Sequence, residues 1–91
     1  MNATEKMFET AIMEATRIIQ KEYGYYAGRF VRMVANKGAV AAAKYLIRKP
    51  GVSEGFTVLC EHKCLRLSVE AYVIKPEYQD LFTDEERKIC E

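Results

Sequence analysis

Apolar residues recur at spacings of three and four along most of this chain, which is the spacing that places side chains on one side of an α-helix. The first such stretch follows Thr4, the expected N-cap, and ends at Gly24. Its apolar positions are Phe8, Ala11, Ile12, Ala15, Ile18 and Ile19. The alternation of apolar and polar residues that is typical of a strand occurs at most over residues 64–67. No Asn-Gly or Asp-Gly hairpin signal occurs. We therefore predict an all-α fold.

A second and a third helix are expected before Pro50-Gly51, which must interrupt helical structure. Gly38 is expected to close the second helix in the left-handed conformation of a C-terminal cap. The third helix should span about residues 39–48. The inward positions expected for the two helices are Tyr26, Phe30, Met33, Val34, Ala39, Val40, Ala43, Leu46 and Ile47.

Cap signals divide the remainder of the chain. Ser53 is the expected N-cap of a fourth helix, and Ser68 of a short helix that Pro76 ends or bends. Thr83-Asp84-Glu85-Glu86 matches the capping box that starts a last helix. The inward positions expected in this part are Phe56, Leu59, Cys60, Val69, Val73, Tyr78, Leu81 and Phe82. The whole pattern predicts a compact bundle of five or six short helices, forming one domain over residues 1–91.

Composition places the chain among globular proteins, with 49% hydrophobic and 30% charged residues. No apolar run approaches the roughly 20 residues of a membrane span, and no signal-peptide core is present. Three cysteines, an odd number, suit a reducing compartment. We expect a cytoplasmic protein with no membrane partner; its oligomeric state is open.

The charges are unevenly distributed, although the formal net charge is only +1. Residues 23–53 contain six cations and no Asp or Glu, together with four tyrosines. Such a segment favours a polyanionic partner, because Lys and Arg pair with phosphates while aromatic rings stack on bases. The predicted binding residues for nucleic acid or another partner are Arg29, Arg32, Lys37, Lys44, Tyr45, Arg48 and Lys49. The alternative is that these cations only solvate helix surfaces.

Many short motifs from Tyr23 onward resemble a small, poorly characterised helical domain of bacteria and their phages, found alone or as an accessory segment of larger proteins. The residues that carry the resemblance are Gly24-Tyr25, Arg29-Phe30, Met33, Gly38, Ala42-Ala43-Lys44, Leu46, Ser53, Gly55-Phe56-Thr57, Leu59, Leu65, Leu67-Ser68-Val69-Glu70-Ala71, Pro76, Tyr78 and Leu81-Phe82-Thr83-Asp84-Glu85-Glu86-Arg87. Cys60 and Cys64 depart from that pattern, since an aromatic and a basic residue are expected there. The resemblance implies a helical fold and a mobile-element setting, but no activity.

Two binding functions remain open on this basis. The first is recognition of nucleic acid, or of a host nucleic-acid-binding protein, by the basic segment. The second is a protein inhibitor or adaptor in phage–host conflict, of the anti-CRISPR type, because exposed tyrosines and arginines are also typical of protein interfaces. Binding measured across a salt series separates them.

A zinc site is the third and weaker possibility. Cys60, His62 and Cys64 lie within five residues, with Cys90 as a possible fourth ligand. On a helix, however, His62 would lie about 200° from Cys60, and spacings of one residue between ligands are unusual. Nucleophilic catalysis needs a base positioned on the nucleophile, and a single His next to two cysteines in sequence does not establish that geometry. We therefore expect no enzyme, no catalytic residue, no cofactor and no metal.

Overall fold

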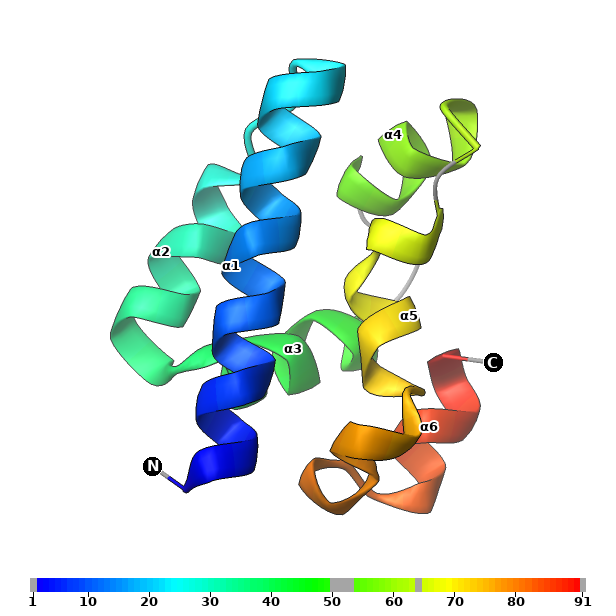
Figure 1. The fold of residues 1–91 in the computed structure, drawn as a ribbon. Coiled ribbons are helices and arrows are strands. Elements are labelled where there is room, and N and C mark those ends of the chain that lie inside the picture. The colour runs from blue at the N-terminus through cyan, green and yellow to red at the C-terminus, as the bar shows by residue number, and fades with distance from the viewer. Residues whose placement is uncertain (1, 50–53, 64, 91) are drawn as a thin grey trace.

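The computed structural model describes residues 2–49, 54–63 and 65–90, except for the side chains of residues 54–56. These parts form six α-helices and two 3-10 helices, and contain no strand. In order they are α1 (Ala3–Tyr23), α2 (Gly28–Lys37), α3 (Ala39–Arg48), α4 (Glu54–Glu61), η1 (Leu65–Leu67), α5 (Val69–Val73), η2 (Pro76–Leu81) and α6 (Asp84–Cys90). The predicted all-α fold is confirmed (Figure 1), although α1, with 21 residues, is not short.

The N-cap of α1 lies two residues before the predicted one. Asn2, not Thr4, is the N-cap, and its Oδ1 accepts a hydrogen bond from the Glu5 amide at 2.8 Å. Asn caps at least as well as Thr, so an earlier start is favourable for the helix. Gly24 ends the helix as predicted, with φ +69°. The buried stripe of α1 is Phe8, Ile12, Ala15 and Ile19.

A single residue, Gly38, joins α2 to α3. Its φ is positive, at +86°, as the prediction required. Its ψ of 159° is extended, however, and the predicted left-handed cap is wrong in that respect. This combination of angles is nearly restricted to glycine. It turns the chain sharply, so that α3 returns against α1 and α2 as soon as α2 ends.

Helix α3 runs from Ala39 to Arg48, as predicted. Its buried side consists of Ala39, Ala42, Ala43 and Ile47, whose small alanines let α1 and α2 approach closely. The prediction that Tyr26 is buried beside Phe30 is wrong, because its side chain is 57% exposed. The reason is that α2 begins only at Gly28, so Tyr26 precedes the helix and does not share its phase.

The main core joins the two ends of the chain. Phe8 of α1 is fully buried and meets Tyr78 and Phe82 edge to face, with ring centroids 5.1 and 5.3 Å apart. Figure 1 shows α2 on one side of α1, α4 to α6 on the other, and α3 crossing near the N-terminal end of α1. Val34 of α2 and Val73 of α5 belong to the same core. No described helix is long and apolar enough to cross a bilayer.

A smaller cluster joins α1 to α4. Ile19 and Leu59 are buried together and are flanked by Tyr23, Tyr25 and Leu67. Burial of Leu59 confirms one expected position of α4.

Cys60, the next residue, is exposed, so the prediction that it faces the core is wrong. One residue rotates a side chain by about 100° around a helix, and Leu59 takes the inward position. Two other expectations for this helix, Ser53 as its cap and Phe56 as a core side chain, lie outside the residues described.

The caps of the last two α-helices match their predictions. Ser68 caps α5, since its Oγ accepts from the Ala71 amide at 3.1 Å. Pro76 starts η2 after α5 has ended. At α6 the Thr83 amide donates to Glu86 Oε1 at 2.9 Å, and the Glu86 amide donates to Thr83 Oγ1 at 3.1 Å. This reciprocal pair is the predicted capping box.

Candidate nucleic-acid interface

The exposed side of α2 carries two arginines, Arg29 and Arg32. They lie one turn apart, away from the buried Phe30 and Val34, because three residues advance a helix by about 300°. Neither arginine forms an ion pair with any residue in the described ranges. Their charge therefore faces solvent, as the prediction requires.

The end of α2 contacts the middle of α3 through a cation and an aromatic ring. Lys37 Nζ lies 5.4 Å from the centroid of the Tyr45 ring, and the Tyr45 side chain is 53% exposed. Lys49, one turn beyond Tyr45, is exposed at the C-cap of α3. Lys37 and Lys49 form no ion pair within the described part of the chain. The structure thus brings together Lys37 and Tyr45, which the sequence could only place on separate helices.

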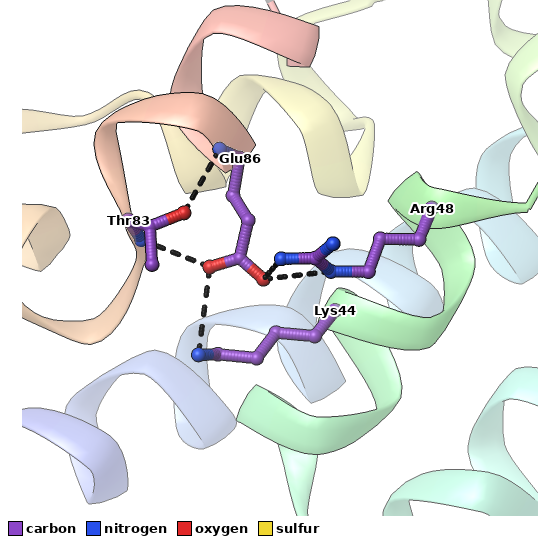
Figure 2. Close-up of polar contacts among 4 residues, drawn as sticks. All are labelled: Lys44, Arg48, Thr83 and Glu86. Carbon is purple, nitrogen blue, oxygen red and sulfur yellow. Dashed lines mark hydrogen bonds and ion pairs between the residues drawn. The ribbon is translucent and has the colours of Figure 1, made fainter.

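Lys44 and Arg48 are paired with a carboxylate, contrary to the expectation that no acidic residue compensates their charge. Figure 2 shows the carboxylate of Glu86 between them: Oε1 lies 3.4 Å from Lys44 Nζ, and Oε2 lies 3.0 Å from Arg48 Nη2. Arg48 Nε also donates to Oε2, at 3.1 Å. The acid-free segment is therefore neutralised in part by a carboxylate from α6, 38 residues beyond Arg48.

Glu86 is the most buried charged side chain among the described residues, at 1% exposure. Burial by itself would raise its pKa, but the Thr83 amide, Arg48 and Lys44 outweigh burial and hold the pKa below its usual value. The carboxylate is therefore ionised at neutral pH. It accepts a hydrogen bond from the Thr83 amide at the start of α6 and pairs with Lys44 and Arg48 of α3. Glu86 therefore joins the two helices, and its role is structural.

Arg48 retains part of its binding capacity. Glu86 contacts one edge of the guanidinium, through Nε and Nη2 (Figure 2). The Arg48 side chain is 53% exposed. Lys44 is more enclosed, at 38%, and also lies near the Phe82 ring. We use the name basic face for the exposed residues Arg29, Arg32, Lys37, Tyr45, Arg48 and Lys49 of α2 and α3, with Lys44 left to the contact with α6. A contact joins Lys37 to Tyr45, whereas no hydrogen bond or ion pair among the described residues joins Arg29 or Arg32 to α3.

The cysteine and histidine residues do not form a metal centre in the parts of the chain that are described, where no cluster of three suitable ligands occurs. Cys60 and His62 are exposed, and the His62 ring packs on Tyr23 with centroids 4.8 Å apart. Burial, followed by the charges of Glu70 and Glu86, raises the pKa of Cys90 to about 11. Such a thiol is a poor metal ligand and a poor nucleophile, since both roles require the thiolate. Cys64 lies outside the described residues.

Comparisons with protein-family models, curated proteins and solved structures found no match to this chain. The resemblance noted in the sequence therefore stays a prediction.

Proposed function

We propose that this chain binds nucleic acid, free or within a nucleoprotein, through the basic face, and that it acts by binding without chemistry on the bound strand. The observation that supports this most directly is the exposure of Arg29, Arg32, Lys37 and Lys49 on two packed helices, with no ion pair in the described ranges. Phosphates are the natural partners of such cations, because pairing releases the counterions condensed on the nucleic acid.

The contrast with the rest of the molecule strengthens the proposal. On α1 the exposed Arg17 is paired with Glu14 within one turn, which is the usual way a helix surface balances its charge. On α2 no acidic residue is available at the corresponding positions. A polyanion would supply the missing negative charge along α2 and the exposed part of α3.

The test is equilibrium binding of a fluorescent oligonucleotide, measured by anisotropy from about 50 to 200 mM salt. The double variant Arg29→Ala, Arg32→Ala should bind more weakly and should lower the slope of log K against log salt by about 0.7–0.9 for each phosphate that it no longer neutralises. Its thermal stability should be unchanged, since both side chains are exposed.

The matched control is Arg66→Ala, which removes an exposed arginine of η1, outside the basic face. It should leave both affinity and slope nearly unchanged. Equal weakening by the control would show that binding follows total charge and not this surface. Absence of binding at about 50 mM salt would refute the proposal.

A further inference from the structure

We infer that the nucleic acid bound by this chain is single-stranded, with an unpaired base stacked on Tyr45. The inference rests on the proposed function and names its substrate class. Its starting point is the position of Tyr45 at the middle of α3, with 53% of the side chain exposed and the ammonium of Lys37 5.4 Å from the ring centroid.

The exposure of this ring leaves it available to a ligand. The buried side of α3 is filled by alanines and Ile47, and Tyr45 lies on the other side. Side chains on a helix lean toward its N-terminus, so the ring extends over the turn that contains Ala41, which is itself exposed and carries only a methyl group. The hydroxyl forms no hydrogen bond among the described residues. Exposed aromatic rings in basic surroundings are the usual stacking platforms for unpaired bases.

Cations surround the ring on the same surface. Arg48 and Lys49 follow Tyr45 by three and four residues, the spacings that make neighbours on a helix. Lys37 approaches from α2. When a base stacks on Tyr45, these side chains lie where they reach the phosphates on either side of it.

Glu86 has a positioning role in this arrangement. By accepting a hydrogen bond from Arg48 Nε and forming an ion pair with Nη2, it fixes the plane of the guanidinium and leaves the other terminal nitrogen without a contact to Glu86 (Figure 2). An arginine held in this way loses less conformational entropy when it pairs with a phosphate. The carboxylate is paired with both Lys44 and Arg48, and these two cations offset its repulsion of a bound strand.

Stacking distinguishes single strands from duplexes. Inside a duplex each base is covered by its neighbours on both faces, so Tyr45 has no base face to contact, and the cations alone bind the backbone. A single strand offers both kinds of contact. Stacking on one aromatic residue accounts for a roughly 5- to 150-fold change in affinity when the ring is removed.

The experiment compares a single-stranded oligothymidine with a duplex of the same length, both fluorescently labelled. Tyr45→Ala should weaken binding of the single strand about 5- to 150-fold and binding of the duplex less than about 2-fold. Tyr45→Phe should retain single-strand affinity within about 2-fold, because the stacking ring remains. The salt slope should not change in either variant, since no charge is removed.

The matched control is Tyr26→Ala. Tyr26 is as exposed as Tyr45, at 57%, but it lines a shallow groove between α1 and α2 with Glu9, Glu14 and Arg17. This variant should bind both probes like the original protein. A loss of single-strand affinity equal to that of Tyr45→Ala would overturn the assignment to Tyr45.

A second readout uses the absence of tryptophan from the chain. Tyr45→Trp introduces a lone indole, whose emission should be quenched by the single strand and not by the duplex. Tighter binding of the duplex, or equal losses for both probes with Tyr45→Ala, would overturn the inference and leave the proposed function standing. If neither probe binds, both are refuted.

Discussion

Glu86→Ala should be the most damaging substitution of a charged residue in the described parts of this protein. The Glu86 carboxylate accepts a hydrogen bond from the Thr83 amide, and removal of such a cap lowers the free energy of unfolding by about 0.5–2 kcal/mol. It also accepts a charged hydrogen bond from Arg48 Nε, worth about 1.5–3 kcal/mol, and forms an ion pair with Nη2. Disruption of a fully buried pair would cost about 3–5 kcal/mol, but Lys44 and Arg48 are 38% and 53% exposed and regain water. We therefore expect a loss of about 2–4 kcal/mol.

The loss is large compared with the stability expected for a domain of this size, about 5–14 kcal/mol. It should lower Tm by roughly 10–25 °C, measured by circular dichroism at 222 nm. Urea titration at about 25 °C gives the free energy of unfolding directly. Glu85→Gln is the matched control, because Glu85 is an exposed carboxylate in the same first turn, and it should cost less than about 1 kcal/mol.

The pH dependence tests the charge separately from the cap. In the folded protein the pKa of Glu86 is lowered, so the stabilisation by its ionised form is present above its unfolded pKa of about 4.3 and is lost as pH falls through the folded value. Glu86→Gln keeps an oxygen for the Thr83 amide but no charge. Its stability should approach that of the original protein below about pH 4. A constant difference between about pH 7 and pH 2, or a cost below about 0.5 kcal/mol for Glu86→Ala, would refute this account.

Two further predictions concern the backbone and the thiols. Gly38→Ala should cost about 1–3 kcal/mol in urea titration, because φ +86° with ψ 159° suits only glycine, whereas Gly24→Asn, at a left-handed position, should cost less than about 1 kcal/mol; equal costs would contradict the strain argument. At about pH 8 iodoacetamide should alkylate the exposed Cys60 faster than Cys90, whose pKa of about 11 leaves roughly 0.1% thiolate. Peptide mass spectrometry against time measures both rates, and faster labelling of Cys90 would contradict its burial.

The features predicted correctly from sequence depend on residues close together in the chain. The bounds of α3, the Ser68 cap and the capping box at Thr83 each follow from side chains within a few positions of one another. Local hydrogen bonds and turn residues determine such features with little influence from the rest of the fold. The failures at Thr4 and Tyr26 are also local, since each follows from a helix start displaced by a few residues.

The features that sequence could not supply depend on distant contacts. The pairing of Glu86 with Arg48 crosses 38 residues, and nothing in the local pattern distinguishes this glutamate from Glu85 beside it except its place in the capping box. The capping box directs the Glu86 carboxylate back toward the Thr83 amide, and this is the signal that the sequence offers. The prediction for Cys60 fails because three apolar residues follow one another at 58–60, so the local pattern does not determine which of them faces the core.

The aromatic contact of Phe8 with Tyr78 and Phe82 has a consequence for how the protein is made. At synthesis rates of about 5–20 residues per second, these partners are added to the chain roughly 4–15 s after Phe8. During that interval the apolar stripe of α1 has no C-terminal aromatic rings to cover it. The core therefore closes only after η2 and Phe82 have been synthesised, and truncated chains that lack η2 should depend on chaperones to stay in solution.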